Sequence, residues 1–215
     1  METVRQPGAQ TRFGRFKIHT SDANLGESEF LAPSLNLGNH LTAIETRAGV
    51  VHPPIVKTLV WIDEEATRAF AGRLAAQPAL RDCYIELHGE LGAGKTSLVR
   101  HLLHALGVQG RVKSPTYAVV ESYALGSTPT GAPALQIWHC DFYRFDDPAE
   151  WEDAGFREIF SGPGLKIAEW PDKAAGFAPR ADLVLRITVH ADGARQITLA
   201  GQTARGDQLL EAVAP

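Results

Sequence analysis

A glycine-rich loop set directly between a strand pattern and a helix pattern restricts the fold of this chain more than any other feature. The apolar run 83–88 predicts a strand, and 97–106 predicts a helix that ends at Gly107 in a left-handed cap. Between the two lies the octapeptide Gly89-Glu90-Leu91-Gly92-Ala93-Gly94-Lys95-Thr96. A strand joined to a helix by so short a loop is the repeating unit of α/β folds, so we expect a sheet covered by helices.

The octapeptide contains every position of the phosphate-binding pattern Gly-x4-Gly-Lys-Thr, the Walker A motif or P-loop. Glycines allow backbone N–H groups to turn inward around a phosphate, and the positive end of the helix that starts near Ser97 adds to the attraction. Lys95 is expected to place its charge on the β- and γ-phosphates of a nucleotide, and the Thr96 hydroxyl to ligate Mg²⁺. The pattern therefore predicts a site for ATP and magnesium in 89–97. The alternative is a glycine-rich turn without a ligand.

Two carboxylates follow apolar strand patterns farther along the chain. Asp141 ends the run 135–140 and could hold Mg²⁺ directly or through water, although it could instead cap the turn before Pro148. Glu169 follows the run 165–168 and could orient water or complete the metal shell, although an ordinary surface glutamate fits the spacing equally well.

Other polar residues leave more than one interpretation open. Thr116 lies in the region where P-loop proteins often carry a switch segment, so it could sense the γ-phosphate or Mg²⁺, or simply form a turn. His139 reads as an ordinary strand histidine. His101 and His104 lie one helical turn apart with no third ligand in view, so we do not expect a zinc site there.

Composition excludes some classes of protein. The 215 residues include 21 basic and 25 acidic side chains, a formal net charge of −4, which argues against a protein whose main task is to grip nucleic acid by its phosphates. Cys83 and Cys140 fall in apolar runs, as reduced core cysteines of a cytoplasmic protein would. We find neither an apolar run near the ~18 residues of a membrane helix nor a secretory pattern in the first twenty residues, so we expect a cytoplasmic location and no membrane contact.

The chain divides into two parts of different character. Residues 1–55 show no sustained helical or strand period, and we interpret them as a poorly ordered, dispensable N-terminal extension that ends near Pro53-Pro54. Residues 56–215 are expected to form one domain. We expect strands at 59–62, 118–124, 135–141, 165–168, 183–190 and 196–200, and helices at 66–76, 148–160 (broken at Gly155) and 204–214.

The order of these elements predicts the type of sheet. Strands and helices alternate first, which favours parallel strands, whereas Asp192-Gly193 between the last two strands indicates a hairpin. We therefore expect an α/β domain whose mixed, mostly parallel central sheet ends in an antiparallel C-terminal hairpin and is covered by helices.

Four segments together resemble a known family. The P-loop at 89–96 is followed by Ser-Pro-Thr-Tyr at 114–117, His-Cys-Asp-Phe-Tyr-Arg at 139–144 and Glu-Trp-Pro-Asp at 169–172. In this order and spacing they resemble TsaE (formerly YjeE), the bacterial P-loop ATPase of tRNA threonylcarbamoyladenosine biosynthesis. The P-loop is common to many families, and the combination is far more specific. The resemblance covers about residues 58–213.

The resemblance implies a function that the spacing alone does not. The fold would be a single three-layer P-loop NTPase domain, and the protein a slow ATPase that assists two partners, TsaD and TsaB. Those partners would transfer the threonylcarbamoyl group to the adenosine beside the anticodon, so contact with tRNA would be indirect.

Site residues carry over from the family one by one. The equivalents of Thr96 and Glu169 bind Mg²⁺, and the aspartate matching Asp141 is needed for hydrolysis. Thr67 resembles a threonine near the nucleotide base, and Arg195 an arginine near the nucleotide. The chain departs from the pattern at Asp172, where glutamate is common, and in its N-terminal extension.

Two alternative functions remain for the same P-loop. A small-molecule kinase would need a lid with arginines, but 146–163 contains only Arg157, which argues against one. A regulator that binds nucleotide without hydrolysing it would differ only in whether Asp141 and Glu169 support chemistry.

Overall fold

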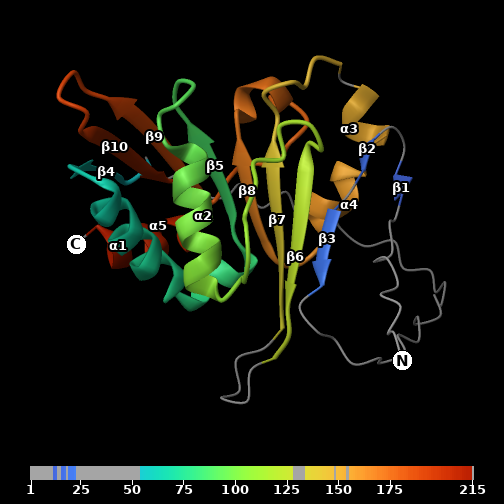
Figure 1. Ribbon diagram of the computed structural model, residues 1–215, viewed down its shortest axis with the longest axis horizontal. Coiled ribbons are helices and arrows are strands. Elements are labelled where there is room, and N and C mark those ends of the chain that lie inside the picture. The colour runs from blue at the N-terminus through green and yellow to red at the C-terminus, as the bar shows by residue number, and fades with distance from the viewer. Residues whose placement is uncertain are drawn as a thin grey trace, which may run out of the picture.

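The computed structural model describes residues 12–13, 16–17, 19–22, 54–127, 134–147, 149–153 and 155–214. An eight-stranded sheet with the order β3-β6-β7-β8-β5-β9-β10-β4 forms its centre (Figure 1). In chain order, the eight strands are β3 (His19–Asp22), β4 (Val56–Trp61), β5 (Tyr84–His88), β6 (Val120–Leu125), β7 (Leu135–Asp141), β8 (Leu165–Glu169), β9 (Leu183–Val189) and β10 (Arg195–Gly201).

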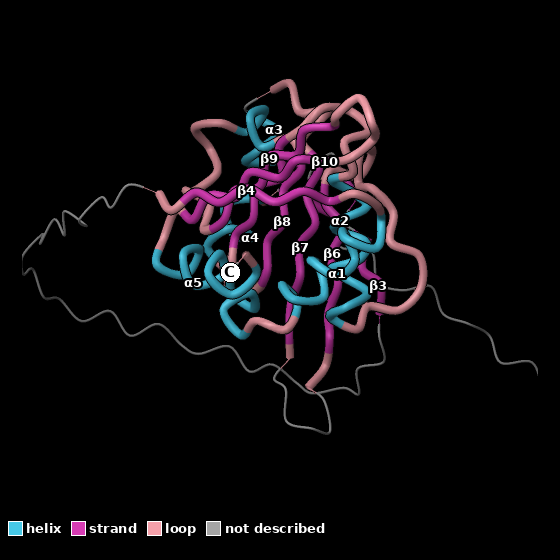
Figure 2. The backbone as a smooth tube through the Cα atoms, turned by 90° about the vertical axis from the view of Figure 1, so that its left-hand side faces the viewer, coloured by secondary structure: helices cyan, strands magenta, loops and turns pink. Residues whose placement is uncertain are grey.

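The sheet is parallel around its centre and antiparallel toward one edge. Strand β5 pairs in parallel with both β8 and β9, and β7 pairs in parallel with β8. Strands β9 and β10 form the antiparallel C-terminal hairpin, and β4 pairs antiparallel with β10. The expected mixed sheet with its terminal hairpin is confirmed. Strands β6 and β7 also pair antiparallel, and both continue beyond the other strands at one end (Figure 2).

Helices cover both faces of the sheet, which gives the three layers that were expected. The helices α1 (Glu64–Ala75), α2 (Lys95–Leu106) and α5 (Ala204–Val213) lie against one face, and α3 (Ala149–Asp153) and α4 (Phe156–Ser161) against the other (Figure 1). Side chains of β5 point alternately to the two faces, so each face carries apolar residues for the helices to cover. Ile85 and Leu87 pack in the core cluster with α1, α2 and α5, and Tyr84 packs in the cluster with α3 and α4.

Local signals explain where the helices begin and end. The Asp63 side chain caps α1 by accepting from the Ala66 N–H at 2.8 Å. Gly107 ends α2 with φ 105°, the left-handed cap that was expected. Gly155, with φ 68°, separates α3 from α4, so the predicted break in that helix is also confirmed.

Some predicted boundaries were wrong. Helix α2 begins at Lys95 rather than at Ser97, because the last turn of the P-loop is already helical. Ala118 and Val119 belong to a turn rather than to β6, since both their N–H groups donate to the Pro115 carbonyl. The short 3₁₀ helices Pro78–Asp82 and Pro171–Ala174 were not foreseen, and both begin at a proline.

The N-terminal extension is only partly described. Most of 1–55 lies outside the described residues, so its predicted poor order stays a prediction. Besides Pro54 and Ile55, the described parts are the two-stranded sheet β1 (Arg12–Phe13) and β2 (Phe16–Lys17), and β3, which pairs in parallel with β6 at an edge of the main sheet. Among the described helices, none has the length and apolar character to cross a membrane.

Both cysteines are buried free thiols, as expected for core cysteines. Burial raises the pKa of each thiol well above its usual range, so both stay protonated and unreactive at neutral pH.

Candidate functional site

The P-loop joins the carboxyl end of β5 to the start of α2 and depends on its glycines. Gly89, Gly92 and Gly94 have φ angles of 144°, 80° and 105°, a region that side chains disfavour. A Cβ at Gly89 would lie 2.6 Å from the Ile187 carbonyl oxygen, whereas one at Gly92 would meet nothing within 4 Å. The loop therefore presses against β9 at one glycine and is open at the other.

This difference predicts unequal effects of alanine. Gly89→Ala should lower the free energy of unfolding clearly more than Gly92→Ala, because it adds a backbone clash to the ~1–2 kcal/mol of left-handed strain that both share. Urea unfolding of the two variants beside the unmodified chain measures this. Equal losses would show that contact with Ile187 does not constrain the loop.

The Lys95 side chain is buried and folds back onto the backbone of the P-loop. Its Nζ donates to the Gly89 carbonyl at 2.6 Å and to the Glu90 carbonyl at 3.0 Å, and it lies 3.9 Å from the centroid of the Trp170 ring. Burial lowers the pKa of the Lys95 ammonium, while Glu169, Asp141 and Glu90 act in the opposite direction. An ammonium held by neutral carbonyls and an aromatic face is available to a phosphate.

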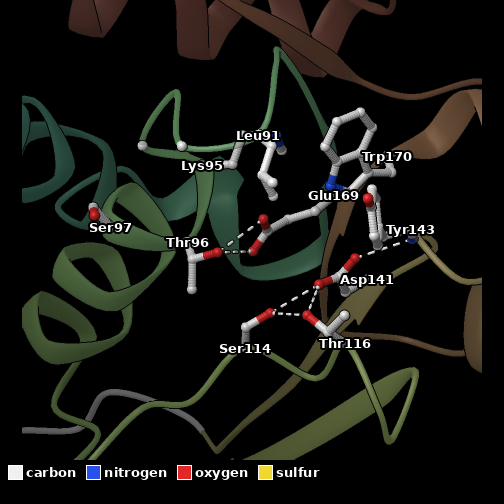
Figure 3. A pocket seen from close by; sticks show the side chains of 12 residues that line it. Leu91, Lys95, Thr96, Ser97, Ser114, Thr116, Asp141, Tyr143, Glu169 and Trp170 are labelled. Carbon is white, nitrogen blue, oxygen red and sulfur yellow. Dashed lines mark hydrogen bonds between the residues drawn. The ribbon is translucent and has the colours of Figure 1, made fainter.

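Thr96 and Glu169 face each other across the site, as Figure 3 shows. The Thr96 hydroxyl lies 2.9 Å from each carboxylate oxygen of Glu169, which ends β8 and is 2 % exposed. On the neighbouring strand, His139 Nε2 lies 2.9 Å from Glu169 Oε1. Glu169 is therefore not a surface glutamate but a buried carboxylate with partners on two elements.

Asp141 lies beside Glu169 in the register of β7 and β8. Its Oδ2 accepts from the hydroxyls of Ser114 at 2.8 Å and Thr116 at 2.7 Å, and its Oδ1 accepts from the Tyr143 N–H at 3.1 Å (Figure 3). Asp141 thus caps the turn that follows its strand and also faces the site. Thr116 belongs to a turn as well, and its hydroxyl is directed into the site.

The turn that carries Thr116 is strained at its end. Val119 has φ 66°, which is costly for a β-branched residue, and its N–H donates to the Pro115 carbonyl at 2.6 Å. The Val119 carbonyl in turn accepts from the Asp141 N–H at 2.9 Å. The segment after α2 is therefore tied to Asp141 through both its side chains and its backbone.

These side chains converge on one pocket of about 240 Å³. It is lined by Leu91, Gly92, Gly94, Lys95, Thr96, Ser97, Ser114, Thr116, Asp141, Tyr143, Glu169 and Trp170. Hydroxyl oxygens, carboxylate oxygens and one ammonium therefore line the same pocket. Such a set suits a hard cation bound together with phosphate oxygens.

The few carboxylates in the pocket do not argue against magnesium. No group of three or more His, Cys, Asp or Glu side chains placed to hold a metal occurs in the described part of the chain. Mg²⁺ in nucleotide sites usually takes only one or two protein carboxylates and completes its shell with water and phosphates.

Five predicted site residues do not line this pocket, namely Gly89, Glu90 and Ala93 within the P-loop and Thr67 and Arg195 outside it. Thr67 is buried in α1, where its hydroxyl lies 3.4 Å from the Asp63 carbonyl oxygen. Arg195 donates from Nε to the Ala93 carbonyl at 3.0 Å and so supports the P-loop from β10. Their assignment to the nucleotide stays a prediction.

Sequence reasoning missed His139 as part of the site. It does lie on a strand, as predicted, and its ring also contacts Glu169. A signal was present, since His139 precedes Asp141 by two residues on a strand and the two therefore share a face. Trp170 was left without a role, and the structure places it over Lys95 with φ 57° and its ring 5.1 Å from that of Tyr143.

Comparison with known proteins identifies the family. The family model for "Threonylcarbamoyl adenosine biosynthesis protein TsaE" matches residues 61–197. The chain belongs to the TsaE family. A TsaE from Haemophilus influenzae is 41% identical over 128 residues, which is 60% of this chain and 76% of that protein. The TsaE from Bacillus subtilis is 33% identical over 158 residues, 73% of this chain and 94% of that protein.

A solved structure supports the same assignment. The crystal structure of Bacillus subtilis YdiB superposes with a TM-score of 0.59 and 25% identity, covering 76% of this chain and 97% of that one. The relatives are named for tRNA threonylcarbamoyladenosine biosynthesis, so the resemblance found in the sequence motifs is confirmed at the level of the TsaE family.

Proposed function

We propose that this TsaE family member is a slow, magnesium-dependent ATPase that acts as a nucleotide-dependent accessory of a TsaD–TsaB complex. That complex would modify the adenosine beside the anticodon of tRNA with a threonylcarbamoyl group. The observation that carries the proposal is the convergence of Lys95, Thr96, Asp141 and Glu169 on one pocket behind a P-loop, in a chain of this family.

The residues present fit a magnesium ion. The Thr96 hydroxyl and the Glu169 carboxylate lie 2.9 Å apart and both line the pocket, so both can give oxygen to one small cation, with Asp141 acting directly or through water. When bound, Mg²⁺ would neutralise charge on the β- and γ-phosphate oxygens. The other groups of the pocket would act on the nucleotide itself.

The protein groups around the phosphates support hydrolysis. Lys95 and the N-terminal end of α2 bring positive charge to the phosphates. We assign the orienting of an attacking water to Asp141, because its carboxylate is buried and faces the pocket while that of Glu169 contacts Thr96, the other expected metal ligand. Its Oδ2 already accepts from Ser114 and Thr116, so a water must compete with these hydroxyls. This competition supports slow turnover.

The rim of the pocket supports a role beside protein partners. Leu91 and Tyr117 are 76% and 83% exposed, and the Arg144 guanidinium lies 4.5 Å from the centroid of the Tyr117 ring. Apolar and aromatic side chains of this kind suit a protein interface. The net charge of −4 suits contact with proteins better than direct capture of tRNA. A cytoplasmic location, where tRNA is modified, is part of the proposal.

Phosphate release tests the proposal against its alternatives. It is measured for the protein alone, with TsaD and TsaB homologues, and with candidate small acceptors, each with and without Mg²⁺. We expect slow, magnesium-dependent release that the partners change. A phosphorylated acceptor would instead establish a small-molecule kinase. Nucleotide binding without release under any condition would leave a non-hydrolysing regulator.

A further inference from the structure

The His139 side chain has one polar contact among the described residues, and its partner is Glu169, the expected metal ligand. The ring is fully buried on β7, and Nε2 lies 2.9 Å from Glu169 Oε1. The other ring nitrogen, Nδ1, is buried and has no hydrogen-bond partner among the described residues. A histidine buried at the cost of an unpaired nitrogen is poorly explained by packing alone.

The chemistry of the pair fixes the direction of the hydrogen bond. An ionised carboxylate only accepts, so Nε2 must carry the proton and donate it to Oε1. His139 stands on the strand next to the one that carries Glu169, and Ile167 is its register partner there. The donor is therefore fixed in position by the pairing of β7 with β8.

The two partners of Glu169 restrain it differently. The Thr96 hydroxyl lies at the same 2.9 Å from both carboxylate oxygens, so it does not distinguish one from the other. It is also an expected metal ligand, so its contact with Glu169 must change when a cation binds. His139 contacts Oε1 alone, so Oε2 has only the Thr96 hydroxyl as a described partner and can turn to a cation when that contact changes.

We propose that His139 is a positioning residue for Glu169, holding Oε1 through its Nε2–H so that Oε2 is presented to the divalent cation of a bound nucleotide. The inference rests on the proposed function, because it needs Glu169 to be a metal ligand. Outer partners of this kind orient ligands in many metal sites, and their loss typically lowers metal affinity about 10–100-fold.

The test is direct metal binding rather than activity. Mn²⁺, bound with ADP, is titrated and the free ion is measured by electron paramagnetic resonance, while metal-free binding of a fluorescent ADP analogue is measured separately. His139→Leu should lower Mn²⁺ affinity by about tenfold or more and leave metal-free nucleotide affinity within about twofold. His139→Gln should retain most of the Mn²⁺ affinity, because its amide nitrogen reaches about as far as Nε2 and can donate.

Two further variants guard against a purely structural effect. Ile137→Val changes the same face of β7 without touching Glu169, and it should bind Mn²⁺ like the unmodified chain. If His139→Leu does not fold, His139→Asn replaces it, since the shorter amide remains polar but reaches only the position of Nδ1. In that case the proposal predicts that His139→Gln binds Mn²⁺ clearly more tightly than His139→Asn, and equal affinities of these two variants would overturn it.

The outcomes separate this inference from the proposed function. If the unmodified chain binds no Mn²⁺ with nucleotide, the proposed function fails and this inference fails with it. If it binds, and folded His139→Leu binds equally well or His139→Gln loses as much as His139→Leu, only the role of His139 is overturned.

Discussion

Lys95→Ala is expected to remove measurable binding of ATP, with or without Mg²⁺. The Lys95 ammonium is buried against the P-loop carbonyls and the Trp170 ring, at the place where the phosphates of a nucleotide would lie. Two charge-assisted hydrogen bonds to phosphate are worth about 1.5–3 kcal/mol each, which corresponds to a loss of about 100-fold or more in affinity. Isothermal titration calorimetry with ATP measures this change in affinity.

Lys166→Ala is the matched control for this experiment. Lys166 is also a buried lysine on the sheet, and burial lowers its pKa as it does that of Lys95. Its Nζ is held by the Gly162 carbonyl and lies 3.8 Å from Asp82, outside the pocket. We expect a loss of stability with ATP affinity retained. Equal ATP binding by the two variants would show that Lys95 does not contact phosphate.

Glu169→Gln is expected to keep nucleotide binding and to lose hydrolysis at the Mg²⁺ concentrations that saturate the unmodified chain. The amide preserves shape but replaces a carboxylate oxygen that faces Thr96 with a weaker ligand for a hard cation. We expect the Mg²⁺ concentration for half-maximal phosphate release to rise by more than the about 10–100-fold typical of an outer partner. Phosphate release over a range of Mg²⁺ concentrations, together with metal-free nucleotide binding, measures both effects.

Glu86→Gln provides the control for Glu169→Gln. Glu86 is a largely buried glutamate on β5 whose carboxylate contacts His88 at 3.2 Å and Tyr84 at 3.2 Å, outside the pocket. This variant should hydrolyse ATP with the magnesium dependence of the unmodified chain. If Glu169→Gln behaves the same way, Glu169 has no part in the metal site.

The sequence predicted the parts of the site that depend on local order. The P-loop follows β5 and leads into α2. This unit could be predicted because binding a phosphate requires the glycines, Lys95 and Thr96 at these positions. Asp141 and Glu169 were placed correctly at the ends of apolar runs. The carboxyl ends of neighbouring parallel strands lie at one edge of a sheet, so both carboxylates come to the P-loop.

The sequence did not predict contacts that depend on strand order and register. The pairing of β7 with β8 brings His139 to Glu169, and no local pattern encodes which strands are neighbours. Trp170, whose ring lies over Lys95, has a left-handed conformation at the N-cap of the 3₁₀ helix that begins at Pro171. Such a conformation in a bulky residue is set by tertiary packing against its own propensity.

Formation of threonylcarbamoyladenosine on tRNA by a reconstituted TsaD–TsaB complex tests the central claim most directly. The modified nucleoside is counted per complex over many turnovers, with ATP and Mg²⁺ present, with this protein, with its Lys95→Ala variant or with neither. We predict that only the unmodified protein sustains repeated turnover. Equal yields with and without it, or full support by Lys95→Ala, would contradict a nucleotide-dependent role in this modification.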